Sequence, residues 1–266
     1  MVCVPWEKRV RLKQKNKMNI FIYDTFLSEK KYNNTLSKIE TRITDLGLNG
    51  KIIRLGLLKN ISGSIENEIK RGAKTLIAVG NNSTLNKVVN AVSQSIHPEA
   101  LNIPIFIIPV GKENNEISVS IGVADYQKAC EVLSSRRIEK LNIVKANNLY
   151  FLSEARISTI GTKVEIDQDY SIELLEKGSI IVNNLITNQK EAPENSVILP
   201  NDNKIELFVK SKKDKKVKSV FSFKKLIISN KNKSLVLDRS IEVKTPVEIE
   251  ISSKKLKLIL GKNRLF

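Results

Sequence analysis

The stretch TLIAVGNNSTLNKVVNAV, residues 75–92, places an apolar run, a glycine-led polar turn and a helical pattern in direct succession. The run at 75–79 is almost wholly apolar, which is typical of a strand buried inside a parallel sheet. After the turn, four apolar residues recur at helical spacing and mark one buried face: Leu85, Val88, Val89 and Val92. The sequence therefore predicts a strand that runs through residues 80–83 directly into a helix.

The same alternation of strand and helix patterns extends outward on both sides. This βαβαβαβ order predicts a doubly wound α/β sheet with helices on both faces. Sheets of this kind place ligands at the carboxyl ends of their strands, where Gly80 and Gly111 stand. The other strand-like runs are 20–23, 51–55 and 103–108. Gly47 and Gly72 end the first two predicted helices.

The pattern changes beyond about residue 144. Short apolar runs are separated by clusters of Asn, Gly, Asp, Pro or Lys, and no long helix is needed. Many short strands at such spacing predict an antiparallel β-sandwich domain. We therefore expect a basic arm at 1–17, an α/β domain at 18–144 and a sandwich domain at 145–266, whose last strand is a candidate to return to the first domain.

The composition excludes several classes of protein. Of the 266 residues, 41% are hydrophobic and 27% are charged, which is typical of globular domains. The longest nearly unbroken apolar run, at 103–110, is too short for a membrane-spanning helix. Two cysteines and one histidine cannot form a zinc site of four cysteines or of paired cysteines and histidines. Residues 1–17 lack the apolar core of a secretory signal, so we expect a cytoplasmic location, with translation starting at Met1 or Met18.

The charge balance points to an anionic partner. The chain has 45 basic and 28 acidic residues, a formal net charge of +17, which suits phosphates, nucleic acid or an anionic membrane surface. An evenly solvated, lysine-rich surface is the equal alternative. Residues 210–225, from Lys210 to Lys225, interleave lysines with apolar residues. We favour a solvated hairpin there, with a phosphate or nucleic-acid patch as the alternative.

A strand that runs into the polar turn at 80–84 and then into a helix has the geometry that binds phosphate. Free backbone N–H groups and the positive end of the helix dipole meet an anion there. The alternative is a turn in which Ser83 or Thr84 caps the helix and does nothing more. The loop at 109–115, at the end of the next strand, favours the phosphate interpretation.

Both loops resemble one family. The sequence VGNNSTLNKVVN at 79–90 resembles the signature G-G-D-G-T-L-N-E-V-V-N of the diacylglycerol kinase catalytic-domain family, and residues 108–115 are similar to its P-L-G-T-G-N-D-F-A segment. Residues 121–123 are similar to its closing L-G-I. Asn142 falls where the family has an aspartate, and residues 238–240 fall where its D-G-E motif is expected.

The resemblance implies a lipid kinase. Members of the family bind ATP and Mg²⁺ between an α/β domain and a β-sandwich and transfer the γ-phosphate to a lipid hydroxyl. It implies a catalytic role for Asp238, and none of the residues that match its motifs is predicted to bind a metal. The nucleotide-binding residues that it implies are Gly80, Asn81, Asn82, Ser83, Thr84, Gly111, Lys112 and Asn114.

The chain departs from the family at the residues that do chemistry. Asn82 replaces the aspartate and cannot act as a base, a loss that typically costs on the order of 10²–10⁴ in rate. Three functions are compatible with this pattern. The favoured one is a catalytically degenerate member that binds nucleotide or lipid. The others are an active, divergent lipid kinase that uses Asp238 or Glu113, and a basic protein that binds RNA or an anionic membrane.

Overall fold

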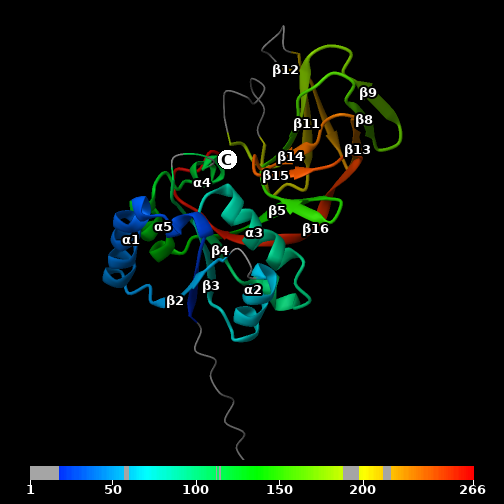
Figure 1. Ribbon diagram of the computed structural model, residues 1–266. Coiled ribbons are helices and arrows are strands. Elements are labelled where there is room, and N and C mark those ends of the chain that lie inside the picture. The colour runs from blue at the N-terminus through cyan, green and yellow to red at the C-terminus, as the bar shows by residue number, and fades with distance from the viewer. Residues whose placement is uncertain (1–17, 57–59, 112, 114, 188–197, 212–216) are drawn as a thin grey trace, which may run out of the picture.

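The computed structural model describes residues 18–56, 60–111, 113, 115–187, 198–211 and 217–266. Within these residues one sheet has ten strands and a second has six, and helices flank only the first (Figure 1). The predicted α/β sheet domain followed by an antiparallel β-sandwich is therefore confirmed. The expected arm at 1–17 and most of the lysines at 210–225 lie outside the described residues or among side chains that are not described.

The α/β lobe is built on four parallel strands in the order β2-β1-β3-β4. Every residue of β1, β3 and β4 is buried, because helices cover both faces of the sheet. The edge strand β2 instead alternates between exposed and partly buried residues. The strand bounds are β1 (Asn19–Tyr23), β2 (Gly50–Arg54), β3 (Thr75–Gly80) and β4 (Ile105–Pro109).

Helices pack in two pairs on the parallel sheet. The pair α1 and α5 covers one face, and the pair α2 and α3 covers the other (Figure 1). Short 3₁₀ turns occupy Thr25–Ser28, Lys30–Tyr32 and Pro98–Asn102. The helices are α1 (Asn33–Asp45), α2 (Ile61–Lys70), α3 (Asn82–Ser93), α4 (Glu116–Ser120) and α5 (Tyr126–Ser135).

The sandwich lobe packs the six-stranded antiparallel sheet, in the order β12-β11-β10-β7-β14-β15, against the far part of the first sheet. Alternate side chains from the two sheets form a second hydrophobic core. The strands of the six-stranded sheet are β7 (Glu154–Ile157), β10 (Gly178–Asn183), β11 (Ile205–Ser211), β12 (Val217–Phe223), β14 (Leu235–Leu237) and β15 (Ile241–Val243). The remaining strands are β5 (Ile138–Ala146), β6 (Leu149–Phe151), β8 (Lys163–Ile166), β9 (Tyr170–Glu173), β13 (Lys225–Ser229) and β16 (Val247–Ile259).

The chain passes between the lobes through two strands, β5 on the way out and β16 on the way back. The last strand, β16, pairs with β13 and β5 and also with β4 of the α/β lobe, where Leu258 lies opposite Ile105. The predicted boundary at residue 144 falls inside β5, where Ile143 belongs to the first core and Val144 to the second. Because the sheet is continuous there, the exact boundary stays a prediction. In the part of the chain that is described, no helix is long and apolar enough to cross a membrane.

Candidate functional site

The turn between β3 and α3 is held by its own hydrogen bonds. Gly80 ends β3 with φ at 154°, and a Cβ at this position would lie 2.1 Å from Thr84 Oγ1, so the turn requires glycine. Asn81 Oδ1 accepts from the N–H groups of Ser83 (3.0 Å) and Thr84 (3.4 Å), while Thr84 Oγ1 accepts from the Asn81 N–H (3.2 Å). This capping box gives partners to N–H groups that a bound phosphate would use.

The alternative in which Ser83 or Thr84 caps α3 names the wrong residue, because Asn81 is the N-cap. The helix begins at Asn82, two residues earlier than a Ser83 cap would allow and three earlier than a Thr84 cap. The extended backbone of Asn81 aims its short amide side chain at the second and third residues that follow it. Asn81 thus replaces a family glycine and keeps the shape of the turn through its side chain.

A buried carboxylate that the sequence analysis missed lies beside this turn. Asp24 follows β1 and is 7% exposed, and its Oδ2 accepts hydrogen bonds from Thr84 Oγ1 and Lys87 Nζ, both at 2.8 Å. Burial opposes ionisation of Asp24, but the hydrogen bonds from Lys87 and Thr84 outweigh it and hold the pKa of this carboxyl below its usual range. The sequence signal that could have identified Asp24 is its position at the carboxyl end of a parallel strand.

The family's aspartate position is occupied by a fixed, neutral amide. Asn82 is 1% exposed, its Nδ2 donates to Glu116 Oε2 at 2.9 Å, and its Oδ1 accepts from the Ile117 N–H at 3.4 Å. Glu116 is the first residue of α4. An aspartate at position 82 would set two carboxylates against each other, so the amide and Glu116 form a matched pair.

Arg239 connects Glu116 to the sandwich lobe. Its Nη1 donates to Glu116 Oε1 at 3.1 Å, and its Nε donates to Glu154 Oε1 at 3.0 Å. Glu154 is only 3% exposed at its side chain and also accepts two hydrogen bonds from Arg156, both at 3.2 Å. A continuous polar chain therefore crosses between the lobes from Asn82 to Arg156. We name this set of five residues, which includes Glu116, Glu154 and Arg239, the cross-lobe network.

The predicted catalytic residue, Asp238, is fully buried in the adjacent turn. Its Oδ2 accepts from the Leu152 N–H (2.8 Å), and its Oδ1 accepts from the Ser153 N–H (2.7 Å), Ser153 Oγ (2.6 Å) and the Glu154 N–H (3.0 Å). Burial raises the pKa of Asp238, although these four hydrogen bonds act in the opposite direction. The catalytic role stays a prediction. The geometry makes this carboxylate an anchor between the β14–β15 turn and the start of β7.

Two asparagines of the T-L-N-x-V-V-N half of the motif join α3 to the sandwich. Asn86 Nδ2 donates to Ser240 Oγ at 2.8 Å. Asn90 forms a two-way pair with the backbone of Tyr150, accepting from its N–H at 2.8 Å and donating to its carbonyl at 2.9 Å. These two asparagines therefore attach α3 to the sandwich lobe, independently of any chemistry at the neighbouring turn.

The second predicted loop lies beside the first. Gly80 pairs with Pro109 across β3 and β4, and the Val110 N–H donates to the Gly80 carbonyl at 2.8 Å. Gly111 has φ at 101°, and Asn115 Nδ2 donates to its carbonyl at 2.9 Å. The structure thus brings Gly111 to the same edge as residues 80–84. Two predicted nucleotide-binding residues, Lys112 and Asn114, lie outside the described residues.

The residues of the cross-lobe network do not fit a bound Mg²⁺. Among the described residues, no group of three or more His, Cys, Asp or Glu side chains could hold a metal ion. The two carboxylates nearest Asn82 in the cross-lobe network, Glu116 and Glu154, already accept hydrogen bonds from guanidinium groups. A hard divalent cation needs several oxygen ligands that are not neutralised in this way.

A hollow of about 620 Å³ lies on the outer face of the six-stranded sheet, next to the cross-lobe network. Its floor includes Val236, which stands between Arg156 and Glu242 across three adjacent strands. Basic, acidic and hydroxyl groups mix along its walls, so its lining does not select one charge. Arg239 is shared between this hollow and the contact with Glu116.

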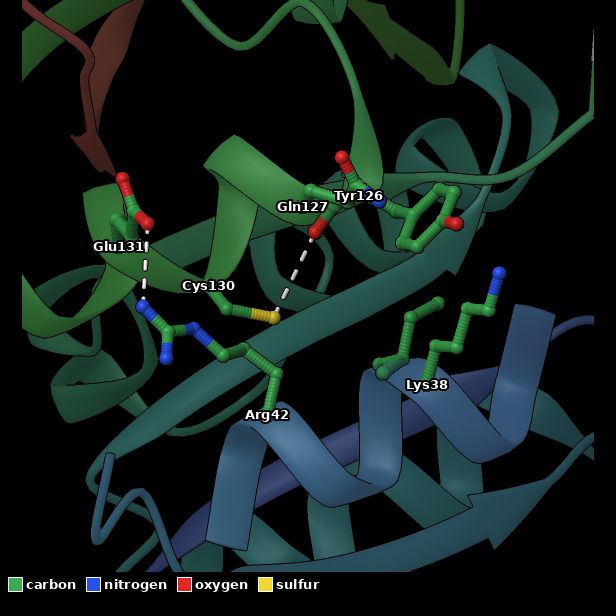
Figure 2. Close-up of a pocket in the computed structure, with 7 residues that line it drawn as sticks. Lys38, Arg42, Tyr126, Gln127, Cys130 and Glu131 are labelled. Carbon is green, nitrogen blue, oxygen red and sulfur yellow. Dashed lines mark hydrogen bonds and ion pairs between the residues drawn. The ribbon is translucent and has the colours of Figure 1, made fainter. Parts of the chain in front are cut away.

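A smaller hollow of about 270 Å³ lies between α1 and α5, apart from the two loops (Figure 2). Arg42 and Glu131 form an ion pair at 3.1 Å beside it. Cys130 Sγ donates to the Tyr126 carbonyl at 3.6 Å, and burial raises the pKa of this thiol to about 11. A thiol that stays protonated is a poor nucleophile, so Cys130 is a packing residue.

Comparison with known proteins finds a family whose model matches the α/β lobe. The model of the diacylglycerol kinase catalytic domain matches residues 19–146. A protein of Staphylococcus epidermidis named "Putative lipid kinase" is 32% identical over 119 residues, which are 44% of this chain and 38% of that relative. A putative lipid kinase from Staphylococcus aureus is 29% identical over 107 residues, which are 40% of this chain and 33% of that relative. The matched segment thus spans less than half of either relative.

Solved structures extend the likeness to both lobes. The crystal structure of a diacylglycerol kinase from Bacillus anthracis superposes with a TM-score of 0.72 and covers 92% of this chain and 98% of that one, at 17% identity. A second crystal structure from the same organism gives a TM-score of 0.73 at 15% identity. At such low identity the likeness concerns the fold, including the sandwich that follows the α/β lobe.

Proposed function

Since residues 19–146 of this chain belong to the diacylglycerol kinase catalytic-domain family, we propose that the protein is a catalytically degenerate, lipid-kinase-like member. It binds an adenine nucleotide between its two lobes without Mg²⁺ and does not transfer phosphate at a useful rate. The proposal concerns the cleft formed by the turn at 80–84, Gly111 and the cross-lobe network.

The single observation that supports loss of catalysis is the pairing of Asn82 with Glu116 and Arg239. An amide stands where the family motif has an acid, and the nearest carboxylate is engaged by both the amide and a guanidinium. A general base must accept a proton and a metal ligand must offer unneutralised oxygen atoms. Glu116 in this arrangement is poorly suited to either task.

Retained nucleotide binding is supported by the backbone of the two loops. Gly80 and Gly111 have positive φ values at the ends of neighbouring strands, and beside Gly111 the nearest atom to a Cβ position is Tyr32 Oη at 4.0 Å, which leaves room for a ligand to approach the backbone there. The capping box preserves the turn, and two cations stand at this edge, Lys87 paired with Asp24 and Arg239 paired with Glu116 and Glu154, for which a nucleotide phosphate would compete with the carboxylates. Cationic side chains in place of a metal ion predict binding that does not depend on Mg²⁺.

The test combines a binding assay with a transfer assay on the full chain. Melting temperature is measured with ATP or ADP, each in excess Mg²⁺ and in EDTA, and phosphoryl transfer is followed from labelled ATP to diacylglycerol in mixed micelles. We expect the same rise in melting temperature in both metal conditions, because a ligand selective for the native state stabilises it by mass action, and no labelled lipid. Metal-dependent labelling of the lipid would instead identify an active, divergent kinase.

A revertant sharpens the test. The triple variant Asn82→Asp, Arg239→Gly, Ser240→Glu restores the family's aspartate and its D-G-E sequence and removes the guanidinium that engages Glu116. We expect its nucleotide-induced rise in melting temperature to become larger with Mg²⁺ than with EDTA. The matched control is Lys38→Met, an exposed substitution on α1 that touches neither loop. A revertant that remains indifferent to Mg²⁺ would contradict the assignment of the cleft.

A further inference from the structure

Two strands carry the chain between the lobes, and side-chain hydrogen bonds from α3 and α4 also cross to the sandwich lobe, from Asn86 to Ser240 and from Ser120 to Ile186. Only β5 and β16 carry the chain from one lobe to the other within the described residues. The pairing of these two strands is interrupted by a register shift between Ile251 and Lys255. A bulge bends a strand and breaks the ladder locally, so this crossing point is the natural hinge.

One ion pair of the cross-lobe network joins the two lobes outside these two strands. Arg239 lies in the β14–β15 turn of the sandwich lobe, and Glu116 begins α4 of the α/β lobe. The two residues are separated by 123 positions in sequence, and their side chains are 31% and 29% exposed. A contact between partly exposed charges contributes little stability and is weakened by salt.

The two ends of Arg239 differ in strength. On the sandwich side, Glu154 is buried and is held by Arg156 as well as by Arg239 Nε. On the α/β side, the contact is the hydrogen bond from Arg239 Nη1 to Glu116, and Glu116 also keeps its bond from Asn82. Separation at Glu116 would therefore leave no deeply buried charge without a partner, which is what a reversible contact requires.

We propose that the Arg239–Glu116 ion pair is an ionic latch that holds the lobes together across the cleft and that a multivalent anion opens by competing for the guanidinium. Opening is a hinge movement at the β5–β16 crossing, with Arg239 remaining attached to Glu154. The latch depends on the proposed nucleotide cleft only for the identity of the anion that opens it. Its existence follows from the contacts alone.

The test measures the distance between the lobes by double electron–electron resonance. Spin labels are placed at Ile96→Cys in the α/β lobe and Leu175→Cys in the sandwich lobe, where the native side chains are 78% and 82% exposed. Cys3 is replaced by serine, and Cys130 is kept because its side chain is fully buried. In this background, Glu116→Gln removes the charge of the latch but keeps side-chain length and a hydrogen-bond acceptor for Arg239.

We expect Glu116→Gln to move the distance distribution toward longer values than in the parent protein. Raising the salt from 0.1 M to 1 M, which shortens the screening length from about 10 Å to about 3 Å, should do the same to the parent but not to the variant. The matched control is Glu165→Gln, which removes an ion pair with Lys163 inside the sandwich lobe. This control should leave the distribution unchanged.

Pyrophosphate and magnesium-free ADP are then compared with NaCl at equal ionic strength. A shift produced by either anion beyond that of NaCl supports competition for Arg239. Identical distributions for the parent, Glu116→Gln and high salt would overturn the latch, because the sheet would then hold the lobes without it. A salt-sensitive latch with no change in melting temperature on adding nucleotide would retain the latch and reject the nucleotide cleft.

Discussion

The β3–α3 turn and the β14–β15 turn lie side by side, joined by the Asn86–Ser240 hydrogen bond and the cross-lobe network, but they are stabilised differently. The first, at residues 80–84, satisfies its polar groups through its own helix by means of the Asn81 capping box. The second, at residues 238–240, is held by hydrogen bonds from the start of β7 to buried Asp238, and Arg239 connects it to Glu116 of the other lobe. The first turn therefore has a local cap in addition to the distant bonds of Asn82 and Thr84, whereas the second depends on distant partners.

The difference teaches where substitutions in the family motifs can accumulate. A local turn tolerates Asn81 in place of glycine because the new side chain completes the cap. In the distant turn, Arg239 in place of glycine is accommodated because Glu116 and Glu154 lie within reach. Both replacements find hydrogen-bond partners, and only Arg239 adds a charge.

The largest effect is expected on removing the anchor of the second turn. Asp238→Ala leaves three backbone N–H groups and the Ser153 hydroxyl without their acceptor in a fully buried position. We expect the free energy of unfolding to fall by at least about 3 kcal/mol in urea titrations, since each orphaned buried donor costs about 1–3 kcal/mol. Asp238→Asn, which retains one acceptor oxygen, should lose clearly less. Equal losses in the two variants would mean that charge, rather than acceptor capacity, holds the turn.

The next effect concerns the charge pair beside the first turn. Lys87→Met leaves Asp24 buried without its cation, and we expect a loss of about 1–3 kcal/mol at pH 7. In the parent the pKa of Asp24 lies below its unfolded value, so its contribution is present above about pH 4 and is lost as the pH falls further. In the variant the buried acid protonates more readily. The difference in the free energy of unfolding between variant and parent, measured by urea titration, should therefore be smaller at pH 4 than at pH 7. A difference that does not change with pH would contradict this account.

A smaller effect tests whether the first turn is self-sufficient. Asn81→Ala removes the side-chain acceptor of the capping box and should cost about 1 kcal/mol, whereas Asn81→Gly, the family residue, should cost only a few tenths. Thermal unfolding of the three proteins under identical conditions gives this order. If alanine and glycine behave alike, the cap is not what keeps the turn in shape.

The sequence was sufficient for the parts of the fold that depend on local periodicity. The apolar spacing of Leu85, Val88 and Val89 predicts the buried face of α3, and all three residues are fully buried. The two glycine-bearing loops were expected at one edge of the sheet because parallel strands end there, and the Val110 to Gly80 hydrogen bond joins them. These features follow from hydrophobic pattern and strand direction, which short stretches of sequence contain.

The pairings of charge in the cleft could not be predicted in the same way. Asp24 meets Lys87 across 63 positions, and Arg239 meets Glu154 across 85. No local pattern selects one carboxylate over another, because the partner of a charge is chosen by tertiary packing. The N-cap was assigned to the wrong residue for a related reason: asparagine, serine and threonine all suit that position, and only the backbone angles of Asn81 decide among them.

The two turns also differ in backbone strain, which in the β14–β15 turn falls on Arg239. Its φ of 56° is in the left-handed region, where a residue with a side chain is strained and glycine is not. Arg239→Ala and Arg239→Gly remove the same ion pairs, but only glycine relieves the strain. The relief of about 1–2 kcal/mol is offset in part by the greater chain entropy of glycine, about 0.5–1 kcal/mol. The glycine variant should therefore be more stable than the alanine variant by about 0.5–1 kcal/mol in paired urea titrations. If the two are equally stable, the β14–β15 turn relaxes once its long-range contacts are gone, which would show that those contacts impose its shape.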